Sequence, residues 1–247
     1  MPTKPNILGL TIDPLTQTQV IQTITQYIES RQPHHIVTAN AEIIYQASRD
    51  PQMKTLIQNA DLITPDGAGV LWAAKYLGTP LPQRVTGIDL IHAICQTAQT
   101  THWRIYLLGA APGIAQKAAQ NLTTLYPGCQ IIGAQHGYYT PQQEPQILAQ
   151  IQQAHPDIIL VALGAPRQEQ WIHTHQPTLQ IPLAIGIGGS LDVISGNLKR
   201  APKWMQKLSL EWLYRILIQP TRLKRATALP KFVLAVRRQR HQNNKQK

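Results

Sequence analysis

The sequence predicts an α/β protein with a mostly parallel, Rossmann-like sheet, helices on both faces of the sheet, and a basic helical appendage at the C-terminus. Short apolar runs alternate with longer segments in which apolar residues recur at helical spacing, as in sheets built from strand–helix–strand units. This alternation stops near Asn197, and the remaining chain is strongly basic. We therefore expect a sheet domain, residues 1–198, and a separate appendage, residues 199–247.

The first half of the chain begins the alternation. Between Pro14 and Ser30, the apolar residues Val20, Ile24 and Ile28 share one face of a helix. Strands are expected at residues 7–10, 35–38 and 61–64, and helices at residues 14–30, 41–48, 51–59 and 68–77.

The second half repeats the pattern more regularly. Apolar strands end at glycine, as at Gly109 and Gly164, and Pro127-Gly128 ends one helix. Because parallel strands place their carboxyl ends along one edge of a sheet, and ligands bind beyond that edge, the residues after each strand are the candidates for chemistry. Strands are expected at residues 104–108, 130–134, 157–163 and 183–187, and helices at residues 113–125, 143–154 and 166–175.

The charge of the chain is concentrated in the appendage. Residues 1–198 hold nine Lys and Arg against eleven Asp and Glu, whereas residues 199–247 hold fourteen against one, Glu211. Apolar residues at helical spacing predict two basic amphipathic segments, at residues 202–217 and 222–240. Such segments indicate that the protein binds an acidic partner. The candidates are anionic lipid, nucleic acid and a phosphorylated substrate.

Composition also bears on the compartment in which the protein works. No stretch reaches the roughly 18 to 20 uninterrupted apolar residues that span a bilayer. Residues 1–11 lack the charged and then apolar pattern of a secretory leader. Cys95 and Cys129 lack metal-ligand spacing and are expected to be reduced, buried thiols. We therefore expect a cytoplasmic protein whose membrane contact is peripheral.

Clusters of glycine and polar residues follow five of the predicted strands, at residues 38–40, 64–69, 109–113, 164–169 and 186–192. Glycine lets the backbone approach a phosphate, and the start of the next helix offers unpaired N–H groups. Together the clusters predict a site for a nucleotide diphosphate, with the substrate-binding glycines Gly109, Gly113, Gly186 and Gly188. Singly, each cluster is equally explained as a turn from strand to helix.

Asp66 is the strongest single candidate for acid–base chemistry. It lies between Pro65 and Gly67, in a tight turn after a predicted strand, where a carboxylate can accept a proton from a substrate hydroxyl group. The alternative is that Asp66 caps the helix expected at residues 68–77. The sequence alone leaves both interpretations open.

The sequence predicts neither a metal site nor another cofactor. His34 and His35 are adjacent, whereas His173 and His175 diverge if they lie in the predicted helix. No D-x-D pair of carboxylates is present to hold Mg²⁺ against a diphosphate. We therefore expect no metal and no cofactor.

Ordered motifs along most of the chain resemble those of one family. They are I-V-T-A-N-A-E at 36–42, A-D-L-I-T-P-D-G-A-G-V at 60–70, L-G-T-P-L-P-Q-R-V-T-G-I-D-L at 77–90, L-L-G-A-A-P-G at 107–113, H-G-Y-Y at 136–139, V-A-L-G-A-P-R-Q-E-Q-W-I at 161–172, R-A-P at 200–202 and L-E-W-L-Y-R at 210–215. From Gly9 to Arg225 the chain resembles the WecG/TagA/CpsF family of bacterial glycosyltransferases. The motifs are specific as an ordered set, and one motif alone would not suffice.

The resemblance implies an inverting, metal-independent transfer of an N-acetylmannosamine-type sugar from a UDP donor to a polyprenyl-diphosphate-linked sugar, in cell-surface polysaccharide or teichoic-acid-type synthesis. It implies that Asp66 is the catalytic base, and that the active site also contains Thr38, Asn40, Arg84 and Gln168. It further implies substrate-binding roles for Asp192, near the nucleotide, and for three appendage residues, Arg215, Arg222 and Arg225.

The acceptor of such a reaction lies in the cytoplasmic leaflet. The basic appendage is then expected to contact the anionic inner face of the plasma membrane, with Trp204, Trp212 and Phe232 at the interface. Residues 232–247 extend beyond the shared motifs and receive no role from the resemblance.

Two other classes of protein stay open as alternatives. A Rossmann-type NAD(P) oxidoreductase would need a G-x-G-x-x-G fingerprint after its first strand, which the sequence lacks. A nucleic-acid-binding protein would use the basic appendage, but its aromatic residues lie on an apolar face that suits a membrane better than base stacking, so we expect no nucleic-acid partner. The donor sugar (N-acetylmannosamine, its uronic acid or another hexose), the acceptor sugar and the choice between monomer and homo-oligomer are left open.

Overall fold

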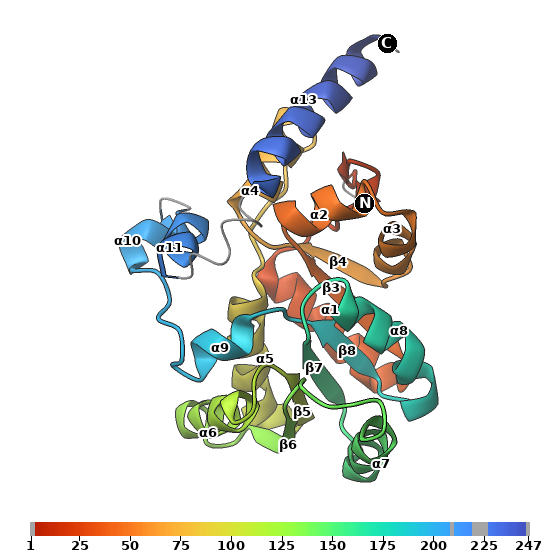
Figure 1. Cartoon of the computed structure of the whole chain (residues 1–247), viewed down its shortest axis with the longest axis vertical. Helices are drawn as coiled ribbons and strands as arrows, with labels where there is room; N and C mark the ends of the chain where they lie inside the picture. Colours follow the sequence, from red (N-terminus) through yellow and green to blue (C-terminus); the bar gives the residue numbers. More distant parts are fainter. Residues whose placement is uncertain (1–2, 208–209, 219–226, 246–247) are drawn as a thin grey trace. The chain divides into compact units, whose positions relative to one another are not determined.

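The computed structural model describes residues 3–207, 210–218 and 227–245 (Figure 1). In these residues six parallel strands form one sheet in the order β4-β3-β8-β7-β5-β6. The strands are β3 (His34–Ala39), β4 (Leu62–Pro65), β5 (Arg104–Gly109), β6 (Gln130–Gln135), β7 (Ile158–Ala162) and β8 (Leu183–Gly186). Helices flank the sheet, so the predicted α/β class with a parallel sheet is confirmed.

The chain folds as two compact units. Unit 1 consists of residues 1–16, 39–86 and 199–247, and unit 2 consists of residues 17–38 and 87–198. Unit 2 contains the helices α1 (Gln17–Ser30), α5 (Gly87–Thr101), α6 (Ile114–Leu125), α7 (Glu144–Ala154), α8 (Arg167–Leu179) and α9 (Ser190–Ile194). Unit 1 contains the helices α2 (Ala41–Ala47), α3 (Pro51–Gln58), α4 (Ala68–Tyr76), α10 (Lys203–Lys207), α11 (Glu211–Ile218) and α13 (Ala228–Lys245), and the short strands β1 (Asn6–Ile7) and β2 (Leu10–Thr11). The basic appendage therefore groups with two segments from the first third of the chain.

The strands of unit 2 are apolar on both faces because protein covers both faces of the sheet. In β7, Ile159 and Val161 belong to a buried cluster that includes Trp171 of α8. Ile158 and Leu160 alternate with them along the strand and are also fully buried. This burial on both faces explains the continuous apolar run in the sequence of β7, where a strand was predicted.

The order of the strands reverses between β5 and β7. From β5 the chain continues to β6 at one edge of the sheet, and from β7 it continues to β8 on the other side. The helices that follow these two strands, α6 and α8, lie on opposite faces of the sheet (Figure 1). Open α/β sheets bind ligands at such a reversal, beyond the carboxyl ends of the strands. The turns after β5 and β7 therefore occupy the position that the topology favours for a ligand.

The prediction of a first strand at residues 7–10 is wrong. β1 and β2 instead form a short antiparallel hairpin in which Ile7 pairs with Leu10. Leu8 and Gly9 turn the chain between them, with φ angles of 52° and 90°. Ile7 and Leu10 are nevertheless fully buried. A buried turn and a short strand give the same apolar run, and periodicity does not distinguish them.

Two helices of unit 2 were not predicted. α5 buries Ile88, Ile91 and Ile94 at helical spacing, but these β-branched residues have low helix propensity, and burial in the core overrides that preference. α9 has only five residues, Ser190–Ile194, which are too few to show a helical period.

The appendage differs in two respects from the predicted pair of amphipathic segments. Two helices, α10 and α11, replace the helix expected at residues 202–217. α13 contacts α2 and α4 (Figure 1), and its residues Phe232 and Val236 are 1% and 0% exposed. Arg240 lies over the ring of Tyr76, 4.3 Å from the ring centroid. Phe232, expected at a membrane interface, is therefore part of the apolar core of unit 1.

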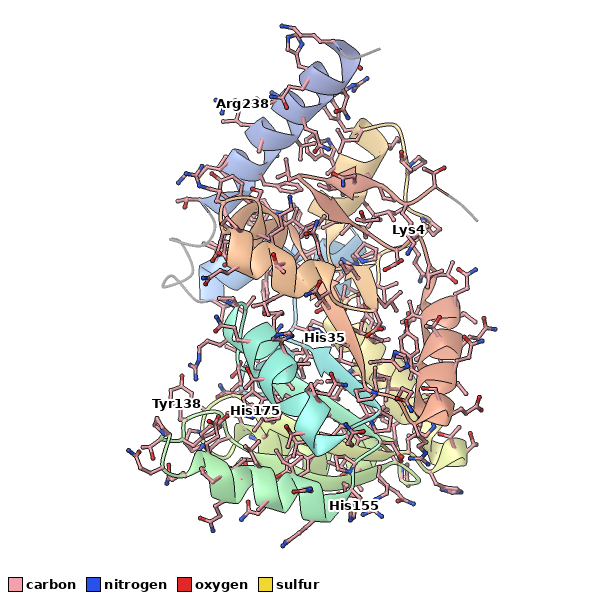
Figure 2. All side chains as sticks on the ribbon, turned by 90° about the vertical axis from the view of Figure 1, so that its right-hand side faces the viewer. Lys4, His35, Tyr138, His155, His175 and Arg238 are labelled. Atoms are coloured by element: carbon pink, nitrogen blue, oxygen red, sulfur yellow. The ribbon has the colours of Figure 1, made fainter. Side chains whose placement is uncertain are left out.

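Other apolar side chains of the appendage face solvent. Among the described residues, five large apolar side chains of residues 199–247 are 40% to 68% exposed, namely Trp204, Trp212, Leu217, Ile218 and Leu234. Arg238 extends outward from α13 on the same unit (Figure 2). Across the residues that the structure describes, no helix combines the length and hydrophobicity needed to cross a bilayer.

Cys95 and Cys129 are free and buried in unit 2, as predicted. A hydrogen bond with Cys129, together with burial, raises the pKa of the Cys95 thiol. Cys95 is therefore held in its protonated form, which is the unreactive state of a thiol.

Candidate functional site

The carboxyl ends of β3 and β4 gather three predicted site residues of unit 1. The N–H group of Asp66 donates to the carbonyl oxygen of Ala39 at a distance of 2.8 Å. The N–H group of Val85 donates to the carbonyl oxygen of Pro65 at a distance of 2.9 Å. Asn40 follows Ala39 in the sequence, and Arg84 precedes Val85. The two bonds therefore bring the backbones of Asn40 and Arg84 close to Asp66.

Asp66 is half-buried and does not occupy the capping position of α4. The N-cap residue is Gly67, whose φ of 110° and ψ of 158° turn the chain from β4 into the helix. This backbone conformation suits glycine and is strained for other residues. The N-cap position of α4 is therefore occupied by Gly67 and not by Asp66, and the acid–base role of Asp66 stays a prediction.

Asn40 has a structural role in addition to its predicted one. Its Oδ1 accepts the N–H group of Ile43 at a distance of 3.0 Å and so caps α2. Such a contact typically stabilises a helix by about 1 kcal/mol. The cap also fixes the side-chain amide of Asn40 beside the end of β3.

An acid from the appendage binds the guanidinium group of Arg84. Nη1 of Arg84 and Nε of Arg200 donate to different oxygens of Glu211, each at a distance of 3.2 Å. The side chains of Arg84, Arg200 and Glu211 are 24%, 26% and 18% exposed. Sequence reasoning missed both Glu211 and Arg200, although Glu211 is the single acid among residues 199–247.

In unit 2, four predicted residues form a largely buried polar group at the carboxyl ends of β3 and β8. The hydroxyl group of Thr38 donates to the carbonyl oxygen of Gly186 at 2.8 Å. Oε1 of Gln168 accepts the N–H group of Gly188 at 3.0 Å. Thr38 and Gln168 are 4% and 1% exposed. A side chain at Gly186 would place its Cβ 2.5 Å from Nε2 of Gln168, so the buried amide group of Gln168 would have to move.

Glu169 completes this buried group and was not predicted. Its Oε1 accepts a hydrogen bond from Nε2 of Gln168 at 2.8 Å, and the residue is fully buried. Its Oε2 has no hydrogen-bond partner within the described ranges of the chain. Burial raises the pKa of Glu169, and the bond from Gln168 opposes that rise. The available signal was spacing, because Glu169 lies one helical turn before the buried Ile172.

Gly109 and Gly113 bound the turn from β5 into α6, at the reversal of the strand order. Gly109 has a φ of 128°, and a side chain there would collide with the carbonyl oxygen of Ala162 in β7. Gly113 is the N-cap residue of α6 and has a φ of 81°. The first turn of this 12-residue helix offers N–H groups and the positive end of a dipole, which favour an anion such as a phosphate.

The remaining predicted residues are only partly described. Asp192 is half-buried in the first turn of α9, and its carbonyl oxygen accepts the N–H group of Leu198 at 2.9 Å. The side chain of Arg215, and all of Arg222 and Arg225, lie outside the described residues. In the part of the chain that the structure describes, no three His, Cys, Asp or Glu side chains gather as a metal-binding group.

The fold and these strand-end residues are those of an α/β enzyme, and comparison with known proteins defines its class. Residues 5–246 match the family described as "Glycosyl transferase WecG/TagA/CpsF family". Since this match covers nearly the whole chain, the protein belongs to that family and is a glycosyltransferase by class.

Curated relatives match over most of their length. A Bacillus spizizenii protein is 38% identical over 212 residues, which cover 86% of this chain and 82% of the relative. A Bacillus subtilis protein is 36% identical over 85% of this chain and 81% of its own. A Staphylococcus aureus protein is 34% identical over 246 residues, covering 99% and 96%. All three are named N-acetylglucosaminyldiphosphoundecaprenol N-acetyl-beta-D-mannosaminyltransferase.

We predict that Glu169→Gln is more stable than the native protein at neutral pH. A carboxyl group whose folded pKa is raised contributes its stability below the unfolded pKa and loses it as the pH rises through the folded pKa. Glutamine keeps an acceptor for Gln168 and cannot ionise. The melting temperature of the Glu169→Gln variant should exceed that of the native protein at pH 7 to 8 by about 2 to 4 °C. The difference should shrink toward the ordinary Glu pKa of 4.5.

Thermal unfolding followed by circular dichroism across this pH range measures the effect. The matched control is Glu29→Gln, because Glu29 is an exposed helical glutamate. If the melting temperature changed with pH in the same way in both variants and in the native protein, the raised pKa of Glu169 would be contradicted.

Proposed function

We propose that the protein transfers an N-acetylmannosamine-type sugar from a UDP donor to a polyprenyl-diphosphate-linked sugar, with inversion at the anomeric carbon and without a metal ion. The printed names of the relatives support the transferred sugar and the lipid-linked acceptor. The observation that carries the mechanism is Asp66, half-buried at the end of β4 with Asn40 and Arg84 near it. The product serves the synthesis of a cell-surface polysaccharide or a teichoic-acid-type polymer.

Unit 2 is the proposed site of the donor nucleotide. The turn from Gly109 to Gly113 and the N-terminus of α6 suit its diphosphate, because they combine close backbone approach with N–H donors. The side chains of Thr38 and Gln168 form hydrogen bonds with the backbone of the turn at residues 186–188. Asp192, in the helix that follows this turn, is proposed to contact the nucleoside.

Asp66 is the proposed general base. Its carboxylate takes the proton of the acceptor hydroxyl group while the hydroxyl oxygen bonds to the anomeric carbon, on the face opposite UDP. The bond between the anomeric carbon and the diphosphate oxygen breaks, and UDP leaves with the electron pair. This direct displacement accounts for the inversion.

Arginine side chains are proposed to supply the positive charge that the leaving diphosphate requires. Arg84 lies next to Val85, whose N–H group is bonded at the end of β4. Arg215, Arg222 and Arg225 of the appendage are proposed to add to it. Donors aimed at developing charge in a water-poor site are commonly among the largest contributions to catalysis.

The appendage is proposed to bring the protein to the anionic inner face of the plasma membrane. Trp204, Trp212 and Leu217 of α10 and α11 are exposed, within a segment that holds fourteen basic residues. Each basic residue near an anionic bilayer contributes on the order of 1 kcal/mol to binding. α13 contributes charge from its exposed arginines, whereas its apolar face is already buried in unit 1.

We predict that Asp66→Asn folds normally and turns over at least about 100-fold more slowly than the native protein, because the amide does not accept the hydroxyl proton. The assay combines UDP-N-acetylmannosamine with a short-chain lipid-diphosphate-linked N-acetylglucosamine and detects the product by mass spectrometry. A panel of other UDP-sugars in the same assay identifies the donor.

The matched control is Asp61→Asn. Asp61 is exposed and lies just before the opposite end of β4, so its charge is removed without changing the strand end that carries Asp66. Near-native turnover by Asp66→Asn would remove Asp66 from the mechanism. Absence of product from every UDP-sugar with the native protein would refute the proposed function.

We also predict that the double variant Trp204→Ser/Trp212→Ser loses most of its affinity for vesicles of phosphatidylglycerol and phosphatidylcholine. Interfacial aromatic side chains and basic charge act together in such binding. Co-sedimentation with vesicles at constant salt measures the loss, which should be at least about tenfold in affinity.

Leu125→Ser is the control for lost apolar surface, because Leu125 is 60% exposed at the end of α6, far along the chain from the appendage. Unchanged vesicle binding by the double variant would contradict the membrane role of α10 and α11. Tight, salt-sensitive binding to DNA in place of vesicles would favour a nucleic-acid partner.

A further inference from the structure

Two neighbouring side chains in the first turn of α8 connect the helix to the turn after β8 through hydrogen bonds in series. Nε2 of Gln168 donates to Oε1 of Glu169 at 2.8 Å, and Oε1 of Gln168 accepts the N–H group of Gly188 at 3.0 Å. Gln168 and Glu169 are both buried. All three residues belong to unit 2, so the series lies within one compact unit.

The two partners of Gln168 determine which way its amide group points. A backbone N–H group only donates, so Gly188 must face the oxygen of the amide. The carboxyl oxygen of Glu169 accepts, so it must face the NH₂ group. If the amide turned over, two donors would face each other at Gly188, and two oxygens would face each other at Glu169. Glu169 therefore favours the orientation in which Gln168 binds Gly188.

The turn after β8 is rich in glycine and depends on contacts from its neighbours. Glycine has more conformational freedom than other residues, so hydrogen bonds from nearby side chains matter more in selecting one conformation. Gly188 has a φ of 52°, in the left-handed region. A Cβ at Gly186 would lie 2.5 Å from Nε2 of Gln168 and 3.2 Å from Oε1 of Glu169. The missing side chain at Gly186 thus leaves room for both side chains beside the turn.

Stability alone does not explain a carboxyl group at this position. Oε2 of Glu169 has no hydrogen-bond partner among the described residues, and burying such an oxygen costs free energy. An apolar side chain of similar length would fill the same space without that cost. Groups that lower stability are characteristic of functional sites. The turn beside Glu169 lies at the carboxyl end of β8, the edge at which open α/β sheets bind ligands.

We propose that Glu169 is a positioning residue that orients the amide of Gln168 and, through it, the turn after β8 that binds the UDP donor. Because both side chains are buried, they act on the donor through the backbone of the turn and do not touch it. This inference rests on the proposed function, which places the donor nucleotide in unit 2. It deepens that function by giving Gln168 an indirect role in donor binding.

Glu169→Met in the full-length chain tests the proposal, because methionine is similar in size and offers no acceptor of comparable strength to Gln168. Hydrogen exchange at the Gly188 amide, measured by NMR, should become at least about tenfold faster relative to exchange at the fully buried Ile185 of β8. The affinity for UDP, measured by isothermal titration calorimetry, should fall by about tenfold. Glu169→Gln keeps an acceptor and should stay within about threefold of the native protein in both measurements. Native exchange at Gly188 or native UDP affinity in Glu169→Met would overturn the proposal.

Gln176→Met is the matched control because it removes a buried polar side chain from the same helix. Nε2 of Gln176 donates to the carbonyl oxygens of His34 and Ile181, which lie at the start of β3 and before β8, away from the turn. This variant should keep native UDP affinity and native relative exchange at Gly188. If it weakened UDP binding as much as Glu169→Met does, general destabilisation would explain the loss and the proposal would be rejected.

A double variant tests whether Glu169 acts through Gln168. If it does, Gln168→Met/Glu169→Met binds UDP no more weakly than Gln168→Met alone, because the second change removes a contact that is already lost. Losses that add together would show an independent role for Glu169 and would contradict the series of bonds.

The native protein provides a test that does not depend on the folding of any variant. The Gly188 amide and the side-chain NH₂ group of Gln168 should exchange slowly, as buried hydrogen-bonded groups do, and fast exchange of either would overturn the proposal. If the native protein bound no UDP, the proposed function would fail. The exchange at Gly188 in Glu169→Met would then still decide whether Glu169 orders the turn.

Discussion

Two backbone hydrogen bonds hold the residues to which we assign the chemistry. Asp66 bonds to Ala39 at the end of β3, and Val85 bonds to Pro65 at the end of β4. Further back along β4, the buried carboxylate of Asp13 accepts the N–H group of Ile63 at 2.7 Å, and the carbonyl oxygen of Ile63 accepts the N–H group of Asp13 at 2.9 Å. A strand of four residues is thus anchored at its middle and at its carboxyl end. This anchored backbone positions the side chains of Asp66 and Arg84 at the end of the strand.

Much of the fold was predictable because strands buried on both faces read as continuous apolar runs. Ile158 to Val161 is such a run, and so is the segment around Leu107. The failures have physical causes. Ile7 and Leu10 are buried but flank a turn, α5 is rich in β-branched residues, and Phe232 lies on the apolar face of a basic helix. An apolar helical face indicates burial, and the sequence does not say whether protein or lipid covers it.

From the residues alone, the candidate site was predictable where the backbone conformation restricts which residue can occupy a position. Glycine at Gly109 is required because a side chain would collide with the backbone of Ala162, and the turn at Asp66 depends on the positive φ of Gly67. Glu169 and the pairing of Glu211 with two arginines escaped prediction. Their roles come from burial and from contacts between residues distant in sequence, including the 127 positions that separate Arg84 from Glu211. No local pattern encodes such contacts.

The claim on which the mechanism depends is that the carboxylate of Asp66 accepts a proton in the rate-limiting chemistry. The dependence of kcat on pH, measured for the native protein and for Asp66→Asn at saturating donor and acceptor, tests it most directly. The account predicts that native kcat falls tenfold per pH unit on the acid side, as the base becomes protonated, and that the slow residual reaction of the variant lacks this acid limb. An identical acid limb in both proteins would show that another group is the base.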